Sequence, residues 1–139
     1  MDDAATLAAF VDELYARMND SDAAFERLIA SGDGVLGIGT DPDEWWDGAA
    51  ALRDAFATQT REMREAGMAV EPGEVRVWQS GDVGWFADRP RIRLPDGSGL
   101  DTRVSGVCRR EAGGWALIHW HISVGVPNED AVGQELTVA

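Results

Sequence analysis

Apolar and polar residues alternate along the last third of the chain, over 100–111 and again over 115–124, with an Ala-Gly-Gly break between the two runs. Both runs are rich in β-branched and aromatic residues, and a period of two is typical of a β-strand. The two glycines of the break allow the positive φ angles of a tight reversal. The pattern therefore predicts a long β-hairpin. In its second arm the wholly apolar face comprises Ala116, Ile118, Trp120, Ile122 and Val124.

In the first half of the chain, apolar residues recur every three or four positions, which indicates amphipathic helices. This spacing predicts one helix over 4–18 and another over 49–66, the latter with Phe56, Gln59 and Met63 among its inward residues. A short helix between them is expected to begin after a Ser21 cap.

The remaining segments are predicted as strands, turns and one longer loop. Strands are expected over 35–38, 75–78 and 83–94. The acidic stretch 40–48, which contains Pro42, is expected to be a loop. Three helices followed by a meander of strands predict an α+β fold. We expect a single domain, 1–139, in which a curved, mixed sheet forms a cone around the helices, with a pocket inside the cone.

The charge and composition of the chain exclude several classes of binding partner and of chemistry. Acidic residues number 25 against 12 basic ones, for a net charge of −13, which argues against binding to a nucleic acid backbone. Every basic residue is an arginine, so chemistry that needs a lysine, such as Schiff-base formation, is excluded. No apolar run approaches the roughly 20 residues of a membrane span, and the first residues lack the basic start of a signal peptide. We therefore expect a cytoplasmic protein without a membrane partner.

Three features of the sequence are candidates for a metal site or a reactive thiol. His119 and His121 point to the same side of one strand, but no further ligand follows at a suitable spacing. The acidic cluster within 40–48 lacks the spaced oxygen ligands of a calcium loop. Cys108 lies among apolar neighbours and is expected to be a buried, unreactive thiol. We expect no metal and no cofactor.

Four segments of the chain resemble a known superfamily. They are 46–52, 81–88, 109–115 with its Arg-Arg-Glu-Ala-Gly-Gly-Trp sequence, and 118–123 with its Ile-His-Trp-His-Ile-Ser sequence. These segments resemble the nuclear transport factor 2-like superfamily, which has a cystatin-like fold, and within it the SnoaL-like proteins. The same residues are similar to the association domain of calcium/calmodulin-dependent protein kinase II, which is not an enzyme.

The resemblance also implies which side chains face inward. It places Ser105 and Ile122 in the interior, where the kinase association domain has pocket arginines. By the same alternation it implies that Phe86, Asp88 and Arg103 point inward. The outer face is then expected to form a homodimer, as superfamily members commonly do, through Trp85, Trp115, His119 and His121.

Asp88 and Arg103 are the predicted catalytic pair, because they would lie on neighbouring strands facing one cavity. If burial dominates, Asp88 can act as a general acid or base beside a carbonyl group, with Tyr15 or Ser105 donating to the oxyanion. If the ion pair dominates, Asp88 only holds Arg103 in place. Trp45 and Trp46 are candidates for a lid that stacks on a flat ligand.

Two functions of different class stay open at this point. One is a cofactor-independent isomerase, dehydratase or cyclase that acts on a small, largely apolar molecule. The other is a non-catalytic ligand-binding or homo-oligomerising domain. The predicted substrate-binding residues are Ser105, Trp120, Trp46, Trp45, Phe86, Ile122 and Phe56.

Overall fold

The computed structural model describes residues 3–20 and 25–135, and within these ranges it contains four helices and nine strands. The helices are α1 (Asp3–Asn19), α2 (Phe25–Leu28), α3 (Ala49–Glu65) and α4 (Asn128–Val132). The strands are β1 (Leu36–Ile38), β2 (Trp45–Asp47), β3 (Ala69–Glu71), β4 (Arg76–Ser80), β5 (Val83–Asp88), β6 (Arg91–Arg93), β7 (Gly99–Asp101), β8 (Arg103–Glu111) and β9 (Gly114–Ser123). The fold is α+β, as the sequence predicts.

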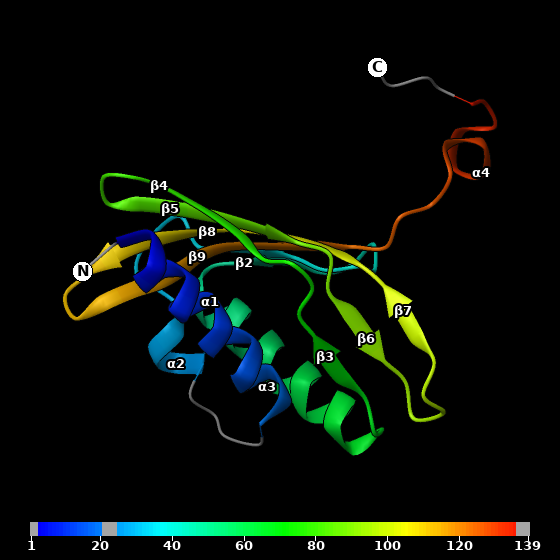
Figure 1. Ribbon diagram of the computed structural model, residues 1–139, viewed down its shortest axis with the longest axis horizontal. Coiled ribbons are helices and arrows are strands. Elements are labelled where there is room, and N and C mark those ends of the chain that lie inside the picture. Colours follow the sequence, from blue (N-terminus) through cyan, green and yellow to red (C-terminus); the bar gives the residue numbers. More distant parts are fainter. Residues whose placement is uncertain (1–2, 21–24, 136–139) are drawn as a thin grey trace.

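Six strands form the main sheet, in the order β2-β1-β9-β8-β5-β4, and three form a small sheet, in the order β3-β6-β7. The main sheet is mixed, because β1 pairs in parallel with β9 while its other pairs are antiparallel. Helices α1, α2 and α3 lie along one face of the main sheet, and the small sheet lies beside α3 (Figure 1). The sheet is curved but not closed, so the helices and the small sheet complete the wall of the cone.

The core lies between the main sheet and the helices. Leu7, Val11 and Leu14 repeat at helical spacing on α1 and are fully buried, as the sequence pattern predicts. Gly84 of β5 lets α1 approach, because a Cβ atom there would come within 2.4 Å of the Leu7 side chain. Burying each such leucine contributes about 2 kcal/mol.

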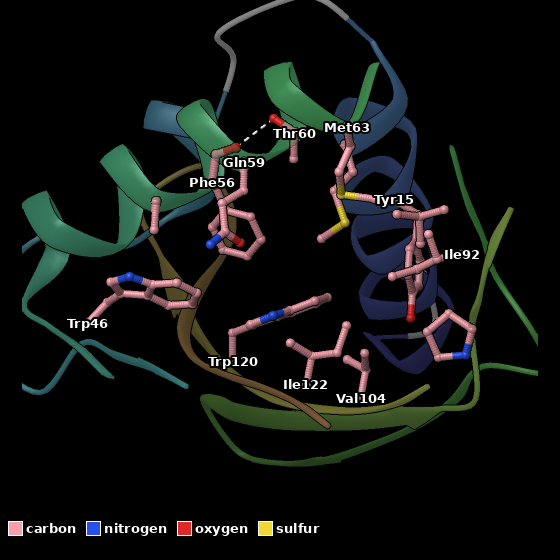
Figure 2. A pocket seen from close by; sticks show the side chains of 14 residues that line it. Tyr15, Trp46, Phe56, Gln59, Thr60, Met63, Ile92, Val104, Trp120 and Ile122 are labelled. Carbon is pink, nitrogen blue, oxygen red and sulfur yellow. Dashed lines mark hydrogen bonds between the residues drawn. The ribbon is translucent and has the colours of Figure 1, made fainter. Parts of the chain in front are cut away.

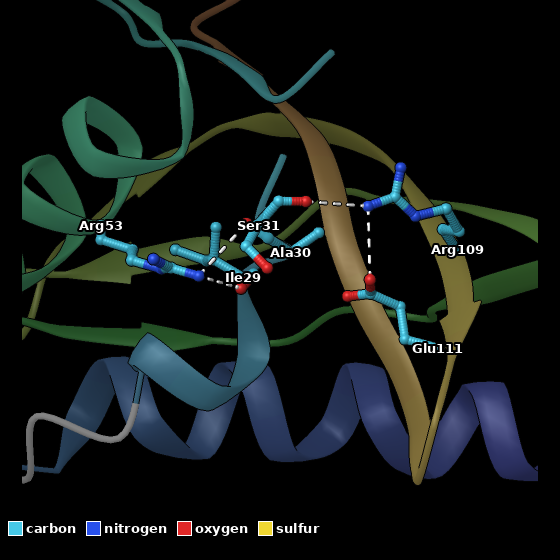
Figure 3. Close-up of polar contacts among 6 residues, drawn as sticks. All are labelled: Ile29, Ala30, Ser31, Arg53, Arg109 and Glu111. Atoms are coloured by element: carbon cyan, nitrogen blue, oxygen red, sulfur yellow. Dashed lines mark hydrogen bonds and ion pairs between the residues drawn. The ribbon is translucent and has the colours of Figure 1, made fainter. Parts of the chain in front are cut away.

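Two arginines bind the segment that joins α2 to β1 (Figure 3). The guanidinium of Arg53 donates to the carbonyl of Ile29 at 2.9 Å and to that of Ala30 at 3.3 Å. Arg109 of β8 donates to the carbonyl of Ser31 at 3.1 Å and also lies 3.4 Å from Glu111. These bonds satisfy backbone carbonyls that follow the end of α2. Carbonyl groups at the end of a helix carry a partial negative charge, which attracts a cation such as arginine.

The expected strand over 83–94 is two strands in different sheets. It divides at Pro90, which lacks an N–H group for the ladder. The carbonyl of Pro90 instead accepts from the hydroxyl of Thr102 at 2.8 Å. The expected loop over 40–48 contains β2, whose Trp46 pairs with Gly37 of β1. The predicted Ser21 cap lies outside the described residues.

A β-bulge in the β8–β9 hairpin corrects the expected side-chain directions. Near the turn, Cys108 pairs with Leu117, but beyond the bulge Val107 pairs with His119, so Ile118 is the extra residue. Without a bulge the turn would pair Arg103 with Ile122, whereas the shift by one residue pairs Val104 with Ile122.

Directly opposite residues share a face, so the bulge puts Val104 and Gly106 inside. Arg103 and Ser105, both expected inside, are exposed on the outer face. Trp115, expected on the outer face, is only 6% exposed and belongs to the core.

Candidate functional site

An apolar pocket opens between α1, α3 and the inner face of the main sheet (Figure 2). Its volume is about 70 Å³, several times the roughly 10–15 Å³ that one water needs. A cavity that holds benzene measures about 150 Å³, so a buried ring would need some side chains to move. The pocket is lined by Tyr15, Met18, Trp46, Ala55, Phe56, Gln59, Thr60, Met63, Val70, Pro90, Ile92, Val104, Trp120 and Ile122.

Trp120 lies across the pocket, between Phe56 and the pair of Val104 and Ile122 (Figure 2). Its ring meets the edge of Phe56 at a centroid distance of 5.3 Å and an angle of 70°, an arrangement that fixes the indole plane. Gly106 lies opposite Trp120 on β8, and the ring of Phe86 packs against it, since a Cβ atom there would come within 2.4 Å of that ring. Among the described residues, the indole N–H of Trp120 has no hydrogen-bond partner.

The second polar group of the pocket is the amide of Gln59 on α3. Its nitrogen donates to Glu44, whose other carboxylate oxygen accepts from the backbone N–H of Asp41 at 2.8 Å. Glu44 thereby fixes the orientation of the Gln59 amide. Thr60, also on α3, uses its hydroxyl to bind the carbonyl of Phe56. Apart from these groups and Tyr15, the pocket wall is apolar.

Tyr15 joins the pocket to Asp88. Its hydroxyl donates to Asp88 Oδ2 at 2.8 Å, and both side chains are buried. The backbone N–H of Gly73 also reaches Oδ2, at 3.1 Å, and that of Arg89 donates to Oδ1 at 2.7 Å. Burial, followed by the hydrogen bond and the charge of Asp88, raises the pKa of Tyr15 well above its ordinary value of 10. The tyrosine therefore stays protonated, and three donors hold the carboxylate.

The sequence of the chain matches one known protein family. The sequence model of one family, described as the SnoaL-like domain, matches residues 7–127. The chain belongs to the SnoaL-like domain family. No curated protein matches the sequence of this SnoaL-like protein significantly.

Solved structures agree with the fold. A nuclear transport factor 2-like protein of unknown function from Pseudomonas putida is 18% identical, with a TM-score of 0.78 over 98% of this chain and 94% of that one. A candidate dehydratase from Streptomyces avermitilis is 19% identical, with a TM-score of 0.75 over 89% and 96%. A candidate association domain of calcium/calmodulin-dependent protein kinase type II, from Thiobacillus denitrificans, is 21% identical, with a TM-score of 0.69 over 87% and 96%.

Of the residues predicted to form the site of the SnoaL-like domain, half line the pocket and half do not. Those that line it are Tyr15, Trp46, Phe56, Trp120 and Ile122. Asp88 and Phe86 are buried beside it, in contact with Tyr15 and Trp120, respectively. Trp45 is 62% exposed and points away from the pocket that Trp46 lines, which follows from alternation along β2. Arg103 and Ser105 lie on the outer face, so the expected ion pair between Asp88 and Arg103 is wrong.

Several residues that line the pocket are not predicted as site residues from the sequence. Helical spacing predicts Gln59 and Met63 on the inward side of α3, and this spacing is the signal that could have found them. Val70 and Ile92 belong to β3 and β6, short strands without a clear alternation. Their place at the pocket depends on the small sheet, which the pattern does not predict.

The outer face of the main sheet carries a pair of exposed tryptophans. The rings of Trp78 and Trp85 stack at a centroid distance of 6.4 Å and an angle of 17°, and they are 37% and 40% exposed. His121 is exposed on the same face, and Nδ1 of His119 lies 2.9 Å from the carbonyl of Leu36. The register places Trp85 opposite Val107 and therefore in one row with His119.

Among the described residues there is neither a group of metal ligands nor a helix that could span a membrane. In the described ranges, no three His, Cys, Asp or Glu side chains are grouped so that they could hold a metal ion. A helix long and apolar enough to cross a membrane is likewise missing from residues 3–20 and 25–135.

Proposed function

We propose that this protein binds a small, largely apolar molecule with one hydrogen-bond acceptor, such as a carbonyl group, in its pocket. The observation that carries the proposal is the indole N–H of Trp120, which has no partner among the described residues although its ring lines an apolar pocket. A donor at the wall of a pocket that has no partner in the protein can bond to a ligand oxygen, and such a bond contributes about 0.5–1.5 kcal/mol. Apolar walls with a few placed polar groups are typical of small-molecule sites.

Cyclopentanone is a suitable probe, and methylenecyclopentane is its matched control, because a CH₂ group replaces the oxygen at almost the same shape. The chain has six tryptophans, so a ¹⁵N-labelled sample gives six indole N–H resonances. Trp120→Phe identifies one of them. We expect cyclopentanone to shift that resonance, and methylenecyclopentane to bind roughly three- to tenfold more weakly, the value of one neutral hydrogen bond. Equal binding of both probes, or no effect on Trp120, would contradict the proposal.

Two alanines on α3 provide a control for the location of the site. Ala55 lines the pocket, whereas Ala50 is exposed on the same helix. Ala55→Leu should fill part of the cavity and weaken binding of cyclopentanone, whereas Ala50→Leu should leave it unchanged. If both variants bind alike, the probe binds elsewhere.

A second candidate is a cofactor-independent isomerase, dehydratase or cyclase, which the contact between Tyr15 and the buried Asp88 at the pocket wall favours. An acid or base beside the ketone would catalyse exchange of its α-protons with deuterium. Cyclopentanone in D₂O, followed by NMR, tests this directly. Catalysis would be supported if the protein accelerates the exchange above its rate in buffer and the Asp88→Asn variant loses this acceleration. If the exchange proceeds at the buffer rate, the protein binds the ketone without catalysing its reaction.

We also propose that two copies pair through the outer face of the main sheet. Stacked, exposed tryptophans such as Trp78 and Trp85 are typical of interface cores and rare on solvated surfaces. Trp115 has no part in this face, because it is buried. Light scattering on the 15.0 kDa chain should give twice that mass. Trp85→Ser should weaken the dimer, whereas Leu100→Ser, at an equally exposed position on β7 of the small sheet, should not. A monomeric wild type would refute the pairing.

A further inference from the structure

The residues after β9 form an arm that leaves the body of the domain. We call residues 124–135 the C-terminal arm. It runs away from the sheet and ends in α4, at a distance from the other elements (Figure 1). Each residue of the arm is exposed, including Val126 and Val132, each at 58%. An arm that projects in this way, with exposed valines on it, is available to pack against another molecule.

The helix in the arm supports this interpretation. It comprises five residues and ends at Gly133, which has a φ of 74° and the left-handed conformation typical of a helix end. A helix of one turn is unstable alone in water, because nucleation costs more than its few hydrogen bonds return. Packing against another surface is the usual source of its stability. The first turn carries Glu129 and Asp130, so that surface should be basic.

A basic surface lies at the base of the arm. Arg76, Arg89 and Arg103 are exposed around a shallow hollow of about 470 Å³ at the end of β5 and the start of β8. The side chains of Arg89 and Arg103 form no ion pair among the described residues, although the chain has 25 acidic residues. Two acidic residues line the same hollow, Glu74 and Asp88. Glu74 lies beyond ion-pair distance of the arginines, and the buried carboxylate of Asp88 accepts from Tyr15 and from two backbone N–H groups, so three arginines face two acidic groups. The hollow can therefore accept an acidic partner.

We propose that two copies of this chain exchange their arms, so that Glu129 and Asp130 of one copy bind in the arginine hollow of the other. Gly125, at the start of the arm, lines a second hollow with Arg89, Arg103 and Asp101, so each arm begins beside the site that its counterpart would occupy. Pro127, with φ of −54° and ψ of 141°, keeps the connection extended, and α4 lies away from the main sheet (Figure 1). This inference rests on the proposed outer-face dimer and deepens it.

Charge reversal tests the exchange on the full chain. One variant reverses the arm, with Glu129→Arg and Asp130→Arg, and the other reverses the hollow, with Arg89→Glu and Arg103→Glu. Each variant alone should dissociate at least tenfold more readily than the wild type, because every arm then meets a hollow of like charge. An equimolar mixture should restore the dimer, because in the mixed pair both arms meet hollows of opposite charge.

Glu62→Arg with Glu65→Arg is the matched control for the arm variant, because it makes the same charge change at exposed positions of α3. Circular dichroism checks that all the variants are folded. Variants that dimerise like the wild type, a mixture no tighter than its components, or a control that dissociates as readily as the arm variant would overturn the exchange. If the arm exchange fails in one of these ways but Trp85→Ser still weakens the dimer, the proposed outer-face dimer holds without the exchange. A monomeric wild type would overturn both.

Discussion

Replacing Asp88 by asparagine should destabilise the fold through one orphaned N–H group. The carboxylate accepts from Tyr15 and Gly73 on Oδ2 and from Arg89 on Oδ1. An asparagine has only one oxygen, so its NH₂ group must face either the N–H of Arg89 or that of Gly73. Only the hydroxyl of Tyr15 can rotate and accept instead of donating.

The cost follows from these contacts. A buried N–H without a partner costs about 1–3 kcal/mol. Each remaining hydrogen bond weakens by about 1 kcal/mol, because its acceptor is no longer charged. Part of this cost is offset, because a neutral amide is easier to bury than a carboxylate. We expect Asp88→Asn to lower the free energy of unfolding by about 2–4 kcal/mol. Tyr15→Phe should lower it by about 1.5–3 kcal/mol, because it removes one bond to a charged group. The double variant should cost less than the sum, by about 1–2 kcal/mol.

Urea unfolding followed by tryptophan fluorescence measures these differences. Asp54→Asn, at an exposed position of α3, is the control for the same chemical change and should stay within about 0.5 kcal/mol of the wild type. If Asp88→Asn is as stable as this control, the three hydrogen bonds do not hold the carboxylate, and the role argued here for Asp88 is wrong.

Three other measurements follow from the structure. Burial raises the pKa of the Cys108 thiol to about 12, so Ellman's reagent at pH 8 should react with it only at the rate of unfolding, and fast labelling of the native protein would contradict that burial. Because the folded-state pKa values of Cys108 and Tyr15 are both raised, stability is retained below pH 9 and falls above it. Urea titrations should show a loss of about 2 kcal/mol between pH 9 and 11 from the thiol, which Cys108→Ala removes. Gly106→Ala should cost about 1–3 kcal/mol, since its Cβ atom would lie 2.4 Å from the ring of Phe86, whereas a comparable loss in the neighbouring Ser105→Ala would point to a different cause.

The sequence predicts the fold well because the helices and the hairpin have strong, local periodicity. The same alternation predicts Trp120 and Ile122 inside, since they lie beyond the bulge on the strand that set the pattern. It fails for Arg103 and Ser105 because one bulged residue, Ile118, reverses the faces of the two strands relative to the turn. Nothing in the local composition around Ile118 indicates an extra residue.

The candidate site is less predictable than the fold, because it depends on contacts between distant segments. Tyr15 and Asp88 are 73 positions apart, and their hydrogen bond requires α1 to pack at a given height against β5. Trp46 enters the pocket because β2 adds to the edge of the main sheet in a segment rich in turn-forming residues. Periodicity can place each residue on a face, but it cannot indicate which faces meet.

The two methionines in the pocket wall, Met18 and Met63, bear on how selective this protein can be. A thioether chain has three rotatable bonds and adopts new rotamers at low cost, so the outline of the cavity can follow that of its guest. The direction of the Trp120 N–H, in contrast, is fixed by the packing of a large ring. Molecules with different carbon skeletons would therefore bind if each places one oxygen atom opposite the Trp120 N–H. Selectivity would then depend on the angle of this hydrogen bond more than on the size of the molecule. Such a protein would recognise a functional group, and a family of related compounds could share it.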